Sequence, residues 1–249
     1  MKRFEGKRIL ITGGTSGIGL ATAKRIVEEG GEVAVTGVTQ DHLDEAGRSL
    51  PSGSLVLRND ASDPAAAKEL ADKIKDQMGK IDGAYLNAGF GNNMATEDVD
   101  AEGFDAMMDV NVRGAALQMA QLKPLINDGG AVLLTASVAP YLGGPKGAIY
   151  AATKASCAAM ARSWARDMAD RNIRVNSVAP GPIETNFFDA FGGSDEDAEK
   201  LREQISKNVP LGRMGKAEEV AAVTCFLLSD DAAYVTGSEY MVDGGMTLR

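Results

Sequence analysis

Thr12-Gly13-Gly14-Thr15-Ser16-Gly17-Ile18-Gly19 is a glycine-rich turn between the apolar segment Arg8–Thr12 and the helical pattern Ile18–Glu29. Glycines permit a sharp turn with positive φ and let a pyrophosphate approach the main chain. The N-terminus of the following helix supplies free N–H donors and the positive end of the helix dipole. A glycine turn between a first strand and a first helix therefore predicts a dinucleotide-binding site.

The spacing of these glycines narrows the kind of nucleotide site. It is Gly-x-x-x-Gly-x-Gly, whereas most dehydrogenases carry Gly-x-Gly-x-x-Gly. The turn also lacks the Gly-Lys-Ser/Thr ending of the loop that nucleotide hydrolases use to hold phosphates. Hydrolysis of ATP or GTP is therefore disfavoured.

The rest of the chain alternates short β-branched segments with longer amphipathic ones. We expect strands at Arg8–Thr12, Glu32–Thr36, Ser54–Arg58, Gly83–Leu86, Ala131–Thr135, Arg174–Val178 and Glu239–Val242. We expect helices at Ile18–Glu29, Asp41–Leu50, Pro64–Met78, Ala101–Ile126, Tyr150–Ala169 and Ala217–Leu228. This order predicts an α/β fold, a doubly wound (Rossmann) parallel sheet of seven strands with helices on both faces. Residues 181–210 are expected to form a long substrate loop.

The composition describes one globular domain over residues 1–249 and restricts its chemistry. The chain is 44% hydrophobic, has no apolar run long enough to span a bilayer, and carries a net charge of −9, which argues against nucleic-acid partners. Its single histidine, His42, lies in a polar stretch, so a metal site is not expected. Cys157 and Cys225 are expected to be buried thiols, and the charged N-terminus lacks a signal peptide, so the expected location is the cytoplasm.

Three further motifs complete a family pattern. Asn87-Ala88-Gly89 follows the fourth expected strand, Ser137 follows the fifth, and Tyr150-Ala151-Ala152-Thr153-Lys154 begins the next helix. Together with the glycine turn, these motifs resemble the classical short-chain dehydrogenase/reductase family over the whole chain, nearest to bacterial ketoreductases and secondary-alcohol dehydrogenases. The resemblance implies an oxidoreductase that transfers a hydride between NAD(P) and a ketone or secondary alcohol.

Four residues are candidates for catalysis. Tyr150 and Lys154 are one helical turn apart on the same face, so an ammonium can favour the phenolate of its neighbour. Ser137 lies at the carboxyl edge of the sheet, where its hydroxyl can bind the substrate oxygen. The resemblance implies that Lys154 also binds the nicotinamide ribose and that Asn111 holds a water in the proton relay behind it.

The same resemblance implies which residues contact the cofactor. Asp60 is similar to the carboxylate that meets the adenine amino group, and Asn87 to Gly89 resemble the wall beneath the adenine ribose. Pro180 to Thr185 are similar to the segment beside the nicotinamide carboxamide. The full expected set is Gly13, Thr15, Ser16, Gly17, Ile18, Gly19, Gly37, Val38, Thr39, Asp60, Ala61, Asn87, Ala88, Gly89, Tyr150, Lys154, Pro180, Gly181, Ile183 and Thr185.

The end of the second expected strand bears on the choice between NAD and NADP. A carboxylate there takes the ribose diol and an arginine takes the 2′-phosphate, but this chain has Gly37-Val38-Thr39, with neither charge. Ser16 in the glycine turn is also neutral. We expect a modest preference for NADP, supported by the hydroxyls of Ser16 and Thr39, with NAD a close rival.

The expected substrate contacts are Ser137, Val138, Ala139, Gly181, Phe187 and Phe188, mostly small or apolar groups that suit an apolar or small carbonyl compound. An alternative is a 3-oxoacyl-[acyl-carrier-protein] reductase, which Val209–Arg213 and Asp243–Gly245 resemble. Such an enzyme needs basic residues to dock an acidic carrier, and the long helix here offers only Arg113 and Lys123. A second alternative, a sensor without turnover, has no need of an acid–base pair.

Two apolar helical stretches, Val112–Leu122 and Ala151–Trp164, exceed what one subunit's sheet can cover. We therefore expect a homo-oligomer, a tetramer by family resemblance, that acts on a small molecule and binds neither nucleic acid nor membrane.

Overall fold

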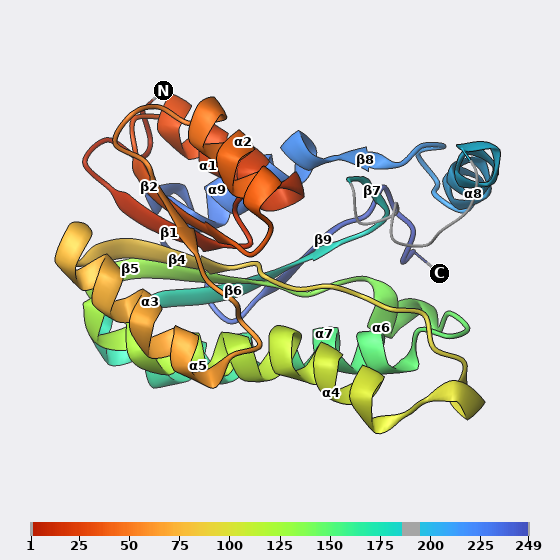
Figure 1. Ribbon diagram of the computed structural model, residues 1–249. Helices are drawn as coiled ribbons and strands as arrows, with labels where there is room; N and C mark the ends of the chain where they lie inside the picture. Colours follow the sequence, from red (N-terminus) through yellow and green to blue (C-terminus); the bar gives the residue numbers. More distant parts are fainter. Residues whose placement is uncertain (1, 186–194, 249) are drawn as a thin grey trace.

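The computed structural model describes residues 2–185 and 195–248, and its centre is a parallel sheet (Figure 1). Seven strands follow the order β3-β2-β1-β4-β5-β6-β9. Their bounds are β1 Arg8–Thr12, β2 Glu32–Gly37, β3 Leu55–Arg58, β4 Ile81–Leu86, β5 Ile126–Thr135, β6 Arg174–Pro180 and β9 Glu239–Val242. All adjacent strands in this sheet pair in parallel, which confirms the expected doubly wound fold.

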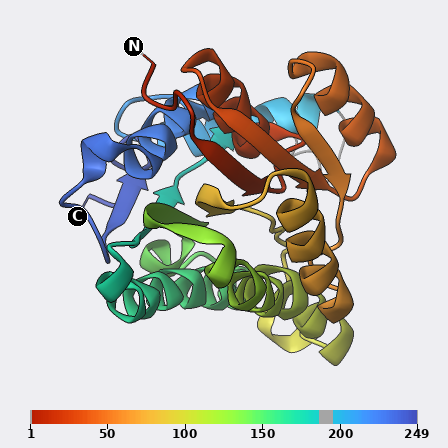
Figure 2. The same ribbon diagram turned by 90° about the vertical axis from the view of Figure 1, so that its left-hand side faces the viewer.

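Helices cover both faces of the sheet, as Figures 1 and 2 show from two directions. One layer contains α1 (Gly17–Glu28), α2 (Gln40–Ser49) and α9 (Ala217–Leu228). The other contains α3 (Pro64–Gln77), α4 (Ala101–Met108), α5 (Ala115–Leu122) and α7 (Ala148–Asp167). Each layer buries its own apolar cluster against the sheet, which is why the central strands are buried along most of their length.

The strand order places the functional edge. The chain leaves β1 toward β2 on one side, and β4 pairs with β1 on the other, so the order reverses at β1. In doubly wound sheets the ligand crevice lies beyond the carboxyl ends of the strands at such a reversal. The glycine turn after β1 and Asn87 after β4 both lie at this point.

The prediction of one helix over Ala101–Ile126 was wrong in the interior of that range and at its C-terminal end. A π-helical turn, Asp109–Gly114, separates α4 from α5. Pro124 lies in a short 3-10 turn, Lys123–Leu125, because proline lacks the N–H that would continue an α-helix. Strand β5 consequently starts at Ile126, earlier than the expected Ala131.

The expected long loop 181–210 contains more structure than predicted. Strand β7 (Ile183–Glu184) pairs with β8 (Gly215–Lys216), and helix α8 spans Asp195–Lys207. Phe187 and Phe188, two expected substrate contacts, lie outside the described residues.

Two further expectations concern buried thiols and membrane helices. Cys157 and Cys225 are both buried, and burial raises the pKa of each thiol, to about 12 for Cys225. Within residues 2–185 and 195–248, none of the helices is long and apolar enough to cross a bilayer.

Candidate active site

The glycine turn packs so closely that side chains are excluded from it. A Cβ on Gly19 would lie 2.3 Å from the Gly13 carbonyl oxygen, and one on Gly13 would lie 2.9 Å from Ala88 Cα. Gly13 and Gly17 both have positive φ, 60° and 50°. Ser16 is the N-cap of α1, but its side chain makes no capping bond. The first N–H groups of α1 therefore stay available to an anion.

The segment after β4 is bound to the glycine turn. Asn87 Nδ2 donates to the Gly13 carbonyl at 3.0 Å, and the Thr135 hydroxyl donates to Asn87 Oδ1 at 2.9 Å. The backbone N–H groups of Asn87 and Ala88 both donate to the Thr12 hydroxyl, each at 3.1 Å. These bonds hold Asn87 to Gly89 beside the turn, where the family resemblance implies a wall beneath the adenine ribose.

Threonines at the strand ends are the part of this site that the sequence analysis missed. Thr12 and Thr135 end β1 and β5, and the Thr36 hydroxyl and carbonyl accept bonds from Gly13 N and Gly14 N. Each of the three is a polar residue at the carboxyl end of a buried apolar strand. That pattern was the available signal, because a hydroxyl at this edge can bond the neighbouring turn.

The ends of β2 and β3 lie next to the turn. A Cβ on Gly37 would lie 2.2 Å from Thr15 Oγ1, so only glycine fits there. Val38 is 48% exposed, and Thr39 is the N-cap of α2 without a side-chain capping bond. Both expected polar groups, Ser16 and Thr39, therefore keep hydroxyls that no helix cap uses.

Asp60 and Ala61 lie in the loop after β3. One carboxylate oxygen of Asp60 accepts bonds from Ser62 N at 2.9 Å and Ser62 Oγ at 2.7 Å. A Cβ on Gly114 would lie 2.4 Å from the Ala61 carbonyl oxygen, so the π-helical turn packs directly against this loop. The expected adenine contacts are thus fixed by a turn and by a close backbone approach.

Lys154 and Asn111 meet at Gly89. A Cβ on Gly89 would lie 3.0 Å from Lys154 Nζ and 2.9 Å from Asn111 Oδ1. Lys154 is only 4% exposed, and its Nζ donates to the Thr135 carbonyl at 3.1 Å. An ammonium has three donors, so this bond leaves donors for a ligand.

Asn111 is held by the loop after β4 and by α7. Its Oδ1 accepts from Phe90 N at 3.0 Å, and its Nδ2 donates to the Phe90 carbonyl at 2.8 Å and to Thr153 Oγ1 at 3.0 Å. Its own carbonyl accepts a bond from Cys157 Sγ at 3.3 Å. The π-helical turn exposes this carbonyl to α7, and the side chain fixes the turn beside the helix that carries Tyr150 and Lys154.

Tyr150 and Ser137 are the two candidates expected to contact the substrate oxygen. Lys154 Nζ lies 5.8 Å from the centre of the Tyr150 ring, so the ammonium approaches the ring as the i, i+4 spacing predicted. Ser137 is 8% exposed and lies two residues after the end of β5. Its Oγ accepts a bond from Ala139 N at 3.2 Å. That contact leaves the Ser137 proton for another acceptor.

The segment after β6 lies next to the residue that follows Ser137. Val138 N donates to the Pro180 carbonyl at 3.2 Å, and Gly181 N donates to the Val242 carbonyl at 3.0 Å. A Cβ on Gly181 would lie 2.7 Å from Asp243 Cα, so the C-terminal segment packs closely here. Ile183 is buried in β7, and a Cβ on Gly17 would lie 3.5 Å from Thr185 Cγ2. Pro180 to Thr185 therefore run from Val138, the residue after Ser137, to the glycine turn.

Two other ionisable groups near the site are structural. Burial raises the pKa of the Tyr85 phenol, whose oxygen lies 2.8 Å from the Thr135 hydroxyl, so Tyr85 stays neutral. Burial also raises the pKa of Cys157, although the nearby Lys154 lowers it. Cys157 is therefore a thiol donor.

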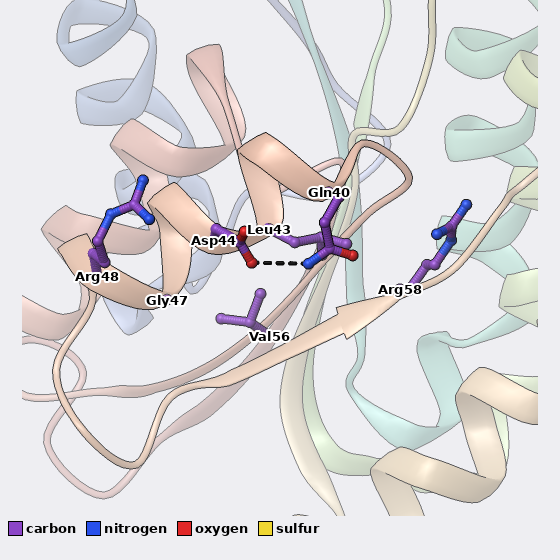
Figure 3. A pocket seen from close by; sticks show the side chains of 7 residues that line it. All are labelled: Gln40, Leu43, Asp44, Gly47, Arg48, Val56 and Arg58. Atoms are coloured by element: carbon purple, nitrogen blue, oxygen red, sulfur yellow. Dashed lines mark hydrogen bonds between the residues drawn. The ribbon is translucent and has the colours of Figure 1, made fainter.

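A cavity of about 540 Å³ lies elsewhere, between α2 and β3 (Figure 3). It is lined by Gln40, Leu43, Asp44, Gly47, Arg48, Val56 and Arg58. None of the four catalytic candidates lines it.

The residues present fit a dinucleotide. The glycine turn is a cradle that a Cβ would fill, the Ser16 hydroxyl does not cap α1, and Lys154 is buried with donors to spare. Gly13 to Gly19 would hold the pyrophosphate, Asp60 the adenine, and Lys154 the nicotinamide ribose. In residues 2–185 and 195–248, the structure has no group of three or more potential metal ligands.

Comparison with known proteins agrees with this geometry. A family model described as enoyl-(acyl carrier protein) reductase matches residues 13–247. The 3-oxoacyl-[acyl-carrier-protein] reductase FabG of Thermotoga maritima is 37% identical, over 99% of this chain and all of that protein. The NADP-dependent (R)-specific alcohol dehydrogenase of Lentilactobacillus kefiri is 33% identical, over 99% of both chains.

A solved structure supports the same assignment. The short-chain dehydrogenase/reductase of Serratia marcescens superposes with a TM-score of 0.90 at 30% identity, over 98% of this chain and 99% of that one. Sequence and structure thus agree over nearly the whole length. The chain belongs to the classical short-chain dehydrogenase/reductase family and is an NAD(P)-dependent oxidoreductase of alcohols and ketones.

Proposed function

We propose that this enzyme transfers a hydride between NADP(H) and a small or apolar ketone or secondary alcohol, with Tyr150 as the acid–base group. The observation that carries the proposal is the position of Lys154. Its Nζ is buried against Gly89, bound to the Thr135 carbonyl, and 5.8 Å from the Tyr150 ring. In that place the ammonium lies beside the ring of the residue that we propose as the acid–base group, and it keeps donors for the nicotinamide ribose.

The residues divide the chemistry between them. A bound nicotinamide supplies the carbon that donates or accepts the hydride. Tyr150 gives a proton to the substrate oxygen during reduction and takes it back during oxidation. The hydroxyl of Ser137 donates a hydrogen bond to that oxygen and stabilises the charge that develops on it. Lys154 binds the nicotinamide ribose with its remaining donors.

Asn111 acts through position. Its side-chain bonds to Phe90 and Thr153 tie the π-helical turn to both the loop after β4 and α7. Asn111 Oδ1 and Lys154 Nζ lie against the same glycine. A water held there would connect Lys154 to solvent and complete the proton relay that the family resemblance implies.

The preference for NADP is modest. A carboxylate after β2 would repel a 2′-phosphate, and Val38 and Thr39 carry none. The hydroxyls of Ser16 and Thr39 are not used in capping, so they can donate to a phosphate. NAD remains a rival because neither residue repels a free ribose hydroxyl.

A 3-oxoacyl-[acyl-carrier-protein] reductase is the second candidate, favoured by the match to the Thermotoga maritima protein. Docking an acidic carrier needs available cations. The two basic residues of this region, Arg113 in the π-helical turn and Lys123 in the 3-10 turn, are both in ion pairs. Arg113 Nη1 lies 2.6 Å from Asp109 Oδ1, and Lys123 Nζ lies 2.5 Å from Asp167 Oδ2. These ion pairs favour the small-ketone function.

A substrate panel tests the proposal. Initial rates with NADPH and NADH would be measured for aryl and alkyl ketones and for acetoacetyl thioesters of a carrier protein and of a small thiol. The proposal expects turnover of the ketones and no gain from the carrier. A rate on the carrier-bound thioester that exceeds every ketone would replace the proposal with the second candidate. If neither NADPH nor NADH were oxidised with any carbonyl compound, the remaining candidate would be a sensor without turnover.

The proposed assembly is a cytoplasmic homotetramer. β9 is the end strand of the seven-stranded sheet among the described residues, and Met241 on it is 39% exposed. In the helix layer that contains α3, α4, α5 and α7, Met160 and Trp164 of α7 are only partly buried. Light scattering after size-exclusion chromatography would give four times the chain mass, and a monomer would contradict this assembly.

A further inference from the structure

We infer that Arg58 binds the 2′-phosphate of the adenosine ribose and is the charged determinant of NADP preference. The inference rests on the proposed function, because it requires a dinucleotide in the crevice. It also supplies a cation that the turn after β2 lacks. The sequence of that turn, Gly37-Val38-Thr39, gives only neutral groups.

The register of the sheet places Arg58 beside the ribose position. Arg58 ends β3 and is the Cα partner of Gly37 at the end of β2. The Asn59 N–H donates to the Gly37 carbonyl at 3.0 Å, which holds the two strand ends together. Neighbouring strands lie about 4.8 Å apart, a gap that an arginine side chain spans. Ribose recognition in this fold occurs at the end of β2.

The side chain also lies on the required face. Side chains alternate along a strand, so Val56 and Arg58 share a face, while Leu55 and Leu57 pack on the other. Val56 packs in the cluster that lies under α1 and α2. Gly37 faces the same way, because its Cβ would meet Thr15 of the glycine turn. One face of the sheet, the face under α1 and α2, thus carries in a row the glycine turn, the end of β2 and Arg58.

The charge of Arg58 is uncommitted. Arg58 is exposed, and its guanidinium forms no hydrogen bond or ion pair within the part of the chain that the structure describes. The acidic neighbours are on α2. Asp44 accepts a bond from Gln40 Nε2 at 2.8 Å, and Asp41 lies in the first turn of the helix. Because Asp41 repels a phosphate, the N-terminus of α2 needs a neighbouring cation in order to bind a phosphate.

Figure 3 supplies a matched control. Arg48 and Arg58 line the same cavity, but Arg58 extends past the carboxyl end of β3 whereas Arg48 lies at the opposite end of α2. Both arginines are exposed, and neither forms a hydrogen bond or ion pair within the part of the chain that the structure describes. Of the two, Arg58 lies beside the end of β2, so we expect that replacing Arg58, and not Arg48, weakens binding of a 2′-phosphate.

The test compares cofactor binding in three proteins. Dissociation constants for NADPH and NADH would be measured by nicotinamide fluorescence in the wild type, Arg58→Gln and Arg48→Gln. We expect Arg58→Gln to weaken NADPH by about 10- to 100-fold, the loss of a charge-assisted contact, and to leave NADH within about twofold. Arg48→Gln should leave both unchanged. Arg58→Lys should recover part of the loss, because it keeps the charge without the planar fork.

Displacement by adenosine fragments provides a readout without nicotinamide. Adenosine 2′,5′-bisphosphate should bind the wild type more tightly than 5′-AMP, and Arg58→Gln should abolish that difference. An unchanged NADPH-to-NADH ratio in Arg58→Gln, or an equal loss for both cofactors, would overturn the inference while the oxidoreductase function stands. A wild type that binds NADH at least as tightly as NADPH would also overturn it. A wild type that binds neither would overturn the proposed function itself.

Discussion

Replacing Gly19 with alanine tests the packing of the glycine turn. The new Cβ would lie 2.3 Å from the Gly13 carbonyl oxygen and 2.8 Å from Asn87 Nδ2. Both distances are about 1 Å short of an ordinary contact, so the turn or the Asn87 side chain must move by about that much. Overpacking of this kind costs about 1–3 kcal/mol, and the better helix propensity of alanine in α1 returns about 1 kcal/mol.

The effect on cofactor binding should exceed the effect on stability. A shift of about 1 Å lengthens the bonds from the N–H groups of the turn to the pyrophosphate. Losing two charge-assisted bonds costs about 3 kcal/mol or more, which weakens NADPH by at least about 100-fold. Fluorescence titration would measure the dissociation constant, and urea unfolding would measure the free energy of unfolding.

Gly47→Ala is the matched control for Gly19→Ala. Gly47 also lies in a helix, α2, but nothing lies within 4 Å of its Cβ position. Alanine there should stabilise the protein by about 0.5–1 kcal/mol and leave NADPH binding unchanged. If Gly19→Ala behaved like Gly47→Ala in both assays, the close packing of the cradle would be wrong.

Three shorter predictions address specificity, stability and the site scaffold. Val38→Asp, at an exposed position after β2, should weaken NADPH by about 10- to 100-fold through charge repulsion and improve NADH, and unchanged constants would contradict the ribose placement. The hydrogen bonds from Arg3 lower the pKa of Glu29 against the opposing effect of burial, so Glu29 stabilises the fold above the unfolded pKa of about 4.3 and loses that effect as pH falls through the folded pKa. Glu29→Gln should therefore be less stable than the wild type in urea at pH 7, with a smaller difference at pH 3; a difference independent of pH would refute this. Thr135→Val removes the donor to Asn87 Oδ1 and should destabilise the fold by about 1–3 kcal/mol in thermal or urea unfolding, unless that bond contributes nothing.

The fold was predictable because local and global signals agree. Most strands of the sheet contain a short, largely apolar run, and a parallel sheet buried on both faces requires such runs. The glycine turn could be identified because no other residue type fits the approach of Gly19 to Gly13. Tyr150 and Lys154 could be paired because the helical spacing alone brings them onto one face.

Other features depend on contacts between distant segments, which periodicity does not reveal. The π-helical turn at Asp109–Gly114 packs where Gly114 approaches Ala61 and where Asn111 bonds Phe90 and Thr153. β7 and β8 are two residues each and pair across more than 30 positions. Strands this short carry no period of their own, so the sequence indicated only a loop.

The use of Arg58 was also hidden from the sequence. The expected position for a cation was the turn after β2, where the chain has none. Only the register between β2 and β3 brings Arg58 beside Gly37. A neutral turn in the sequence is therefore compatible with a charged site in the fold.

The central claim is that the Tyr150 hydroxyl moves the proton while Lys154 supports it. The most direct test is kcat for ketone reduction by Tyr150→Phe, with the NADPH dissociation constant measured on the same protein. Phenylalanine keeps the ring and removes only the hydroxyl, so kcat should fall by about 10²- to 10⁴-fold while NADPH binding changes by less than about threefold. A Tyr150→Phe enzyme with the kcat of the wild type would contradict the account.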